Sequence, residues 1–177
     1  MNPKKTILAI SGSLRSGSSN HNILKFLGRS VPDEIHYFIY DRLAEIPPFD
    51  PGLDNEHPPE AVSELRCFMR NAAGIVICTP EYAFGVPGQL KNILDWMVSS
   101  GSLVDKPVAL VTASSVGANA HASLLLTLGA LSAKVNEDAT LLIPFIRSKM
   151  DADGNVTDVE TKEALLKVME VFLKEID

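Results

Sequence analysis

The sequence is short of the residues that build metal centres and disulfide frameworks. Among its 177 residues there are two cysteines, Cys67 and Cys78, and four histidines, and neither set shows the spacing of a metal site. Each cysteine lies in an apolar stretch, so we expect both to stay reduced and to pack as small hydrophobic residues. The sequence therefore predicts neither a metal centre nor a disulfide.

Long apolar runs and an excess of basic residues are also missing. No stretch approaches the ~18 apolar residues of a membrane span, and the apolar stretch near the N-terminus is too short for the core of a secretion signal. Sixteen basic against 22 acidic residues give a formal net charge of -6, which opposes non-specific binding to nucleic acid or anionic lipid. We therefore expect a cytoplasmic protein without nucleic-acid or membrane partners, in which any anion site is local.

What the sequence does contain is a regular alternation of β-branched apolar runs and stretches of helical period. This alternation predicts a parallel sheet covered on both faces. The predicted strands are 6–10, 34–39, 74–78, 108–112 and 139–143, and the predicted helices are 20–28, 60–70, 88–99, 121–133 and 158–175. With right-handed crossovers, these units predict one domain over residues 1–177, a flavodoxin-like three-layer α/β/α sandwich with a five-stranded parallel sheet of order 2-1-3-4-5. Residues 41–59 hold five of the eleven prolines and are expected to be a long surface connection.

Ligands of such sheets bind beyond the carboxyl ends of the strands, so the loops after the first, third and fourth strands matter most. The first loop, SGSLRSGSSN at 11–20, has two glycines, five serines and Arg15 before a helix begins. Helix N–H groups, hydroxyl donors and a guanidinium together suit a phosphate, and Arg15 is expected to be the only fixed cation there. An ordinary turn and helix cap would use the same residue types. The spacing matches no P-loop or G-x-G-x-x-G motif.

The second loop, TPEYAFGVPG at 79–88, surrounds Tyr82 and Phe84 with prolines and glycines. Such a stiff loop can present main-chain groups to the edge of a flat heterocycle such as isoalloxazine. Glu81 in this loop is open to three interpretations: a solvated acid, a partner in an interface, or a group near a cofactor.

The third loop, ASSVGANAH at 113–121, again consists of small residues before a helix. Ser114, Ser115 and Gly117 are candidates to hydrogen-bond a flavin ring or its ribityl chain, although a helix entry uses the same types. The role of His121 is left open.

Two motifs resemble those of the NADPH-dependent FMN reductase family, which includes bacterial quinone, chromate and azo-dye reductases. GSLRSGSSN at 12–20 is similar to the family's GSLRxxSxN, and PEYAFGVPGQLKNILDW at 80–96 is similar to PEYNxSxPGxLKNxxDW. KPVALVTAS before the third loop supports the match. Ala83 stands where the family often has asparagine, and Gly85 where serine is common.

The resemblance implies an FMN cofactor, with NADPH or NADH as co-substrate, in an enzyme that reduces flavin, quinone or related small acceptors by ping-pong hydride transfer. The flavin carries the chemistry, so no catalytic side chain is expected. A homodimer or homotetramer is also implied. The implied contacts to the FMN phosphate are Ser13, Arg15, Ser18, Ser19 and Asn20; those to the ring are Pro80, Glu81, Tyr82 and Ala83; and those of the third loop are Ser114 and Ser115.

Two other functions are compatible with a bound flavin. One is a one-electron carrier of the flavodoxin type without NAD(P)H activity, and the other is a flavin- or nucleotide-binding regulator without turnover. The sequence identifies neither the electron acceptor nor the cation that would bind the ribose phosphate of NADPH.

Overall fold

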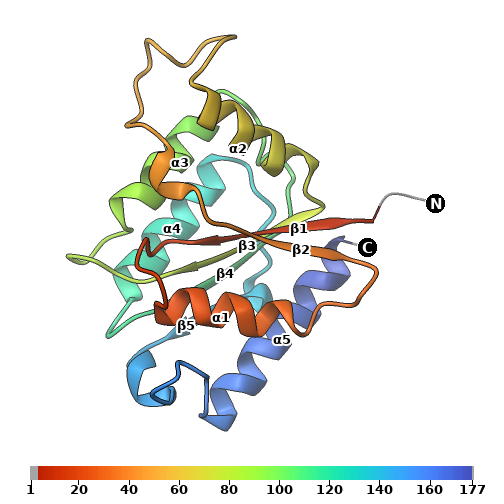
Figure 1. Cartoon of the computed structure of the whole chain (residues 1–177), viewed down its shortest axis with the longest axis vertical. Coiled ribbons are helices and arrows are strands. Elements are labelled where there is room, and N and C mark those ends of the chain that lie inside the picture. Colours follow the sequence, from red (N-terminus) through yellow and green to blue (C-terminus); the bar gives the residue numbers. More distant parts are fainter. Residues whose placement is uncertain (1–3, 177) are drawn as a thin grey trace.

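The sheet has the predicted topology. In this computed structural model, residues 4–176 are described, and residues 1–3 and 177, the ends of the predicted domain, lie outside the described residues. Five strands of the described chain form one parallel sheet in the order β2-β1-β3-β4-β5 (Figure 1). The strands are β1 Thr6–Ser11, β2 His36–Tyr40, β3 Gly74–Thr79, β4 Val108–Ala113 and β5 Thr140–Ile143.

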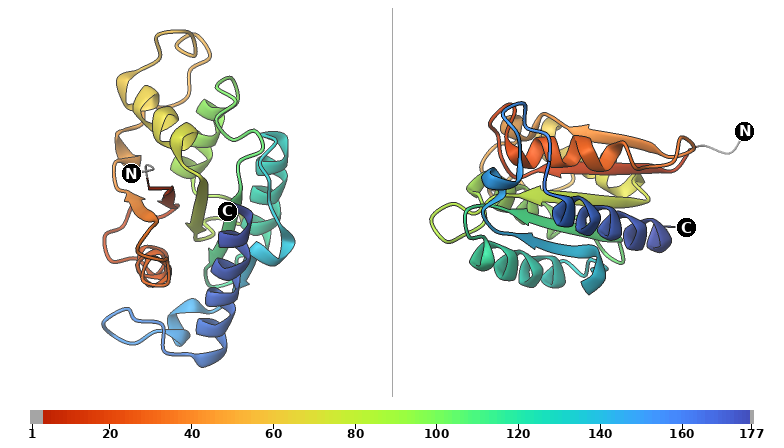
Figure 2. Two further views of the ribbon diagram at one scale, coloured as in Figure 1. Left: turned by 90° about the vertical axis from the view of Figure 1, so that its right-hand side faces the viewer. Right: turned by 90° about the horizontal axis from the view of Figure 1, so that it is seen from below.

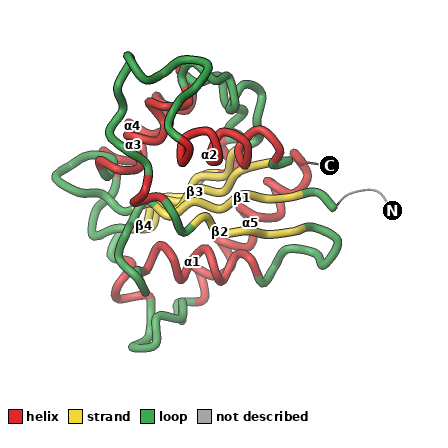
Figure 3. The backbone as a smooth tube through the Cα atoms, turned by 45° about the horizontal axis from the view of Figure 1, so that its top comes forward, coloured by secondary structure: helices red, strands yellow, loops and turns green. Residues whose placement is uncertain are grey.

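Helices cover both faces of the sheet, as Figures 2 and 3 show. They are α1 Ser19–Gly28, α2 Glu60–Asn71, α3 Gly88–Met97, α4 Ala118–Ala130 and α5 Val159–Ile176, with short 3-10 turns η1 Leu43–Glu45, η2 Glu137–Ala139 and η3 Ile146–Lys149. One core packs α1 and α5 against the sheet, and a second core packs α2, α3 and α4 against the other face. The three-layer prediction is therefore confirmed.

The central strands explain why this arrangement is stable. Every residue of β3 and of β4 is buried, because side chains alternate between the two faces and both faces are covered. Ile75 and Ile77 enter the core beside α2, α3 and α4, whereas Val76 and Cys78 enter the core beside α1 and α5. Strands buried on both sides are almost continuously apolar, and β3 and β4 follow this pattern with one buried threonine each.

The two cysteines behave differently from each other. Cys78 is buried in β3, and burial raises the pKa of its thiol. Cys67 is exposed on α2, so the prediction that it packs as a small hydrophobic residue is wrong. Helical period is the reason: Leu65 and Met69 face the core, which turns position 67 outward.

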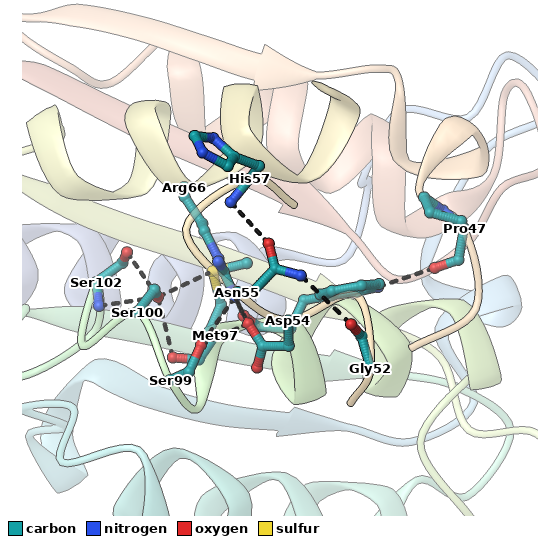
Figure 4. A network of polar contacts seen from close by, with 11 residues as sticks. Pro47, Gly52, Asp54, Asn55, His57, Arg66, Met97, Ser99, Ser100 and Ser102 are labelled. Atoms are coloured by element: carbon teal, nitrogen blue, oxygen red, sulfur yellow. Dashed lines mark hydrogen bonds and ion pairs between the residues drawn. The ribbon is translucent and has the colours of Figure 1, made fainter. Parts of the chain in front are cut away.

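The connection 41–59 is held against α2 and α3 by polar contacts (Figure 4). The buried Arg66 side chain donates to Asp54 Oδ1 at 2.7 Å, to Ser99 Oγ at 3.0 Å and to the carbonyl of Trp96. The indole Nε1 of Trp96 donates to the Pro47 carbonyl at 2.9 Å, and the ring itself is buried core. The connection is therefore an ordered surface segment that hydrogen bonds hold against α3.

None of the helices within residues 4–176 is both long enough and apolar enough to cross a membrane.

Gly12 lets the first loop lie directly against the end of β3. Its N–H donates to the Cys78 carbonyl at 2.8 Å. A Cβ at this position would lie 2.2 Å from Oγ1 of Thr79, a fully buried side chain. Only glycine permits this approach, which brings the first and second loops together.

Gly12→Ala is expected to destabilise the protein by about 1–3 kcal/mol, because the new methyl group overpacks a buried site. The free energy of unfolding is measured by urea denaturation. Gly129→Ala is the control: nothing lies within 4 Å of a Cβ there, and alanine in a helix is favoured over glycine by about 0.5–1 kcal/mol. Equal stability of the two variants would show that the loop does not depend on the close approach.

Candidate functional site

A cavity of about 700 Å³ lies where the carboxyl ends of the strands meet. Its volume is within the ~300–1,000 Å³ range of ligand pockets. Segments that follow β1, β3, β4 and β5 form its walls. The lining residues are Ser13, Arg15, Ser18, Ser19, Asn20, Pro80, Glu81, Tyr82, Ala113, Ser114, Ser115, Phe145, Ile146, Arg147 and Ser148.

The structure brings together nearly all of the residues predicted from the two motifs and the third loop. Ala83 and Gly117 are the two predicted residues that do not line the cavity. Ala83 lies in a tight turn beyond the cavity, and Gly117 is the N-cap of α4 with a left-handed φ of 96°. The remaining predicted residues converge from three separate loops on one space.

The first loop forms a polar wall at the start of α1. Ser18 caps the helix, and its hydroxyl accepts the N–H of His21 at 3.2 Å. Ser13, Ser18 and Asn20 are buried polar residues, and the Ser13 N–H donates to Ser11 Oγ. The first N–H groups of a helix have no partner within it and carry the positive end of its dipole. The loop therefore caps α1, and its residue types also suit an anion.

The second loop is shaped by a tight turn from Tyr82 to Gly85. Each of these two residues donates its N–H to the carbonyl of the other, at 3.0 and 2.9 Å. Between them, Ala83 and Phe84 have left-handed φ angles of 48° and 59°, which residues other than glycine and asparagine adopt at a cost of about 1–3 kcal/mol each. The phenol oxygen of Tyr82 lies 3.4 Å from Ser13 Oγ, so this loop also contacts the first.

Glu81 joins the second loop to the third. Its carboxylate accepts the N–H groups of Gly117 and Ala120, at 3.3 and 2.9 Å, at the beginning of α4. Its own N–H donates to Ser114 Oγ at 3.1 Å. Of the three interpretations left open, a freely solvated acid is ruled out, because the side chain caps α4 while it lines the cavity.

His121 lies behind the cavity and does not line it. Its Nδ1 is 2.9 Å from Oγ1 of Thr112, a buried residue of β4. Burial lowers the pKa of the imidazole below its usual value, which favours the neutral ring. In the described part of the chain, no three His, Cys, Asp or Glu side chains are grouped so that they could hold a metal ion.

A fourth wall was missed by the sequence analysis. Phe145, Ile146, Arg147 and Ser148 follow β5 and line the cavity. Arg15 remains the one cation that the first loop contributes, as expected, and Arg147 adds a second cation to the cavity wall. The carboxyl end of β5 lies at the same edge as those of the other strands, and this topological argument was the one available signal.

Comparison with known proteins relates the chain to flavin-dependent reductases. The family model for NADPH-dependent FMN reductase matches residues 6–147. A quinone reductase of Escherichia coli is 32% identical over 97% of this chain and 95% of its own. An NAD(P)H-dependent FMN reductase of Pseudomonas aeruginosa is 29% identical over 94% of this chain and 92% of its own. Among solved structures, the flavoenzyme NAD(P)H:(acceptor) oxidoreductase FerB of Paracoccus denitrificans aligns with a TM-score of 0.82 and 26% identity, covering 97% of both chains.

Glu81→Ala is expected to lower the free energy of unfolding by about 1 kcal/mol, since the beginning of α4 loses its cap. Amide exchange at Gly117 and Ala120 should become faster in the same variant. Glu81→Gln keeps one acceptor oxygen and should lose less. Glu163→Ala, at an exposed acid of α5, is the control and should change stability by less than about 0.5 kcal/mol. If Glu81→Ala behaves like this control, the cap does not stabilise α4.

Proposed function

The chain belongs to the NADPH-dependent FMN reductase family, and we propose that it binds one FMN in the cavity described above and passes reducing equivalents from NAD(P)H to a small acceptor. The observation that carries the proposal is the convergence of both family motifs on one cavity of about 700 Å³. The chain from residue 1 to 177 would then act as one flavin-binding domain. We also propose a cytoplasmic location.

The residues of the first loop suit the phosphate end of FMN. Ser13, Ser18, Ser19 and Asn20 offer hydroxyl and amide groups beside the beginning of α1, and Arg15 adds a cation. The Arg15 guanidinium has no hydrogen bond or ion pair with any residue from 4 to 176, which leaves its donors available to a ligand. A dianionic group would compensate the positive end of the helix dipole here.

The second and third loops suit the ring end. Pro80, Glu81 and Tyr82 would lie along the edge of the isoalloxazine, and the hydroxyl groups of Ser114 and Ser115 would lie near the ribityl chain. When bound, FMN supplies the chemistry of taking up a hydride and of passing reducing equivalents on. The task of the chain is then to hold the ring and to leave one of its faces open to substrates. Neither task needs a protein acid, base or nucleophile.

The substrate class follows from the relatives. The relative in Escherichia coli is a quinone reductase, and another in a Burkholderia species is a 2-hydroxy-1,4-benzoquinone reductase. We infer that quinones or similar flat acceptors are reduced here as well. The exposed ring of Tyr82, a residue of the cavity wall, offers an apolar surface against which such a molecule can stack.

A homodimer or homotetramer is part of the proposal. Large apolar side chains remain uncovered near the second loop and on α4: Phe84 is 76% exposed and Leu126 is 78% exposed. A contact between copies of the chain would remove these two side chains from water, which is favourable. The oligomeric state of the protein in solution is measured by sedimentation or light scattering.

The purified protein, after incubation with FMN and removal of the excess, is expected to show the absorption bands of a flavin, and NADPH or NADH should bleach them under anaerobic conditions. Addition of a benzoquinone should restore the bands. Bands that neither nucleotide bleaches would identify a one-electron carrier or a regulator, and failure to take up FMN would disprove the proposal.

Steady-state rates with FMN bound are expected to give parallel lines in double-reciprocal plots when NADPH and a quinone are varied. The reason is that a single open flavin face can hold only one substrate at a time, so the oxidised nucleotide must leave before the quinone enters. Lines that intersect would mean that both substrates occupy the cavity together.

A further inference from the structure

The turn after β5 is fixed in place by the third loop. The N–H groups of Phe145 and Ile146 donate to the carbonyls of Ser115 and Ser114, both at 3.2 Å, and the Ile146 side chain is buried. Phe145 holds a left-handed φ of 54°, a conformation that costs energy for a side chain of this size and tends to occur at functional sites. The backbone from which Arg147 extends is therefore held rigidly.

This turn lies beside the N-terminal end of α1. Figure 1 and the right-hand view of Figure 2 show η3 next to the beginning of this helix, and Ser18, Ser19 and Arg147 line the same cavity. Farther along, a Cβ at Gly154 would lie 2.1 Å from Nδ2 of Asn22, so the segment stays close to the first turns of α1. Arg147 thus extends from a wall that adjoins the proposed phosphate position.

The Arg147 side chain has no partner within residues 4–176, in contrast to its neighbours. Ser148 Oγ donates to the Phe145 carbonyl at 2.8 Å, and Lys149 Nζ pairs with Asp158 at 3.2 Å. Elsewhere in the fold, Arg42 and Arg66 each pair with a carboxylate. Within η3, Arg147 is therefore the polar side chain that remains available to a ligand.

Charge balance favours a phosphate as that ligand. The charged residues of the cavity wall are Arg15, Glu81 and Arg147, and the carboxylate of Glu81 already accepts N–H groups from the beginning of α4. A phosphate monoester carries about −1.5 to −2 charges at pH 7. One arginine would compensate at most about half of a dianion's charge in a chain with a net charge of -6, and a second arginine would compensate more of it.

We propose that Arg147 is a second cationic contact to the FMN phosphate, which it approaches from the wall after β5 while Arg15 approaches from the first loop. This inference rests on the proposed binding of FMN. It assigns a binding role to a residue outside both motifs.

The test compares FMN with riboflavin, which has the same ring and ribityl chain but no phosphate. Dissociation constants are measured on flavin-free protein by titration of flavin fluorescence. Arg147→Ala should weaken FMN binding about 10–100-fold, the effect of a lost charge-assisted hydrogen bond, and should leave riboflavin binding unchanged. Arg147→Lys should recover part of the loss because it keeps the charge. Arg15→Ala should show the same selective loss.

Arg70→Ala is the matched control, since Arg70 is exposed on α2 and lies outside the cavity. It should leave both dissociation constants unchanged. Urea denaturation of each variant checks that the fold is intact, and Arg147 is exposed, so little change is expected.

Three results would overturn the inference alone. Equal effects of Arg147→Ala on FMN and riboflavin, or no effect on either, would show that the guanidinium does not contact the phosphate. An unchanged FMN affinity with a raised KM for NADPH, but not for NADH, would assign Arg147 to the nucleotide instead. Each of these leaves the proposed function standing. Wild-type protein that binds no FMN would refute the proposed function and the inference with it.

Discussion

The close contact between Gly12 and the end of β3 is the constraint on which the site depends. The sheet places β1 beside β3, but a side chain at position 12 would separate their loops, because Thr79 occupies the space. With glycine there, the first and second loops meet, and the phenol of Tyr82 comes within 3.4 Å of Ser13 Oγ. The cavity wall is thus continuous from the helix terminus of α1 to the second loop.

The remaining loops are joined to this pair by further contacts. Glu81 ties the second loop to the beginning of α4, and the carbonyls of Ser114 and Ser115 hold the turn that follows β5. Four loops that are distant in sequence therefore form one connected rim. A rim tied together by main-chain and side-chain hydrogen bonds is largely preformed, which reduces the ordering cost of binding. Helix α3 begins where the second loop ends. Its side chains Gln89, Asn92 and Trp96 donate hydrogen bonds to carbonyls of the connection 41–59, so this connection is also held in place.

Much of the fold follows from the sequence because its main signals are local. The strands β3 and β4 are apolar except for a threonine near the end of each, and the order of the sheet follows from handedness and chain length. The first three loops could be predicted from their glycines, prolines and serines. Arg147 could not, because one arginine after a short strand looks like any surface arginine until the sheet brings its turn beside α1. The prediction for Cys67 was wrong because apolar neighbours in the sequence do not show which side of a helix a residue faces.

The turn from Tyr82 to Gly85 shows whether main-chain or side-chain atoms determine the conformation of the second loop. The family often has asparagine where this chain has Ala83, and asparagine tolerates the left-handed conformation that position 83 adopts here. Alanine has neither this tolerance nor a polar side chain, yet the two hydrogen bonds between Tyr82 and Gly85 are formed. The conformation thus persists without the side chain that favours it. Under the proposed function, the contribution of this turn to flavin binding therefore comes from the path of the main chain, while the side chain at position 83 lies beyond the cavity wall.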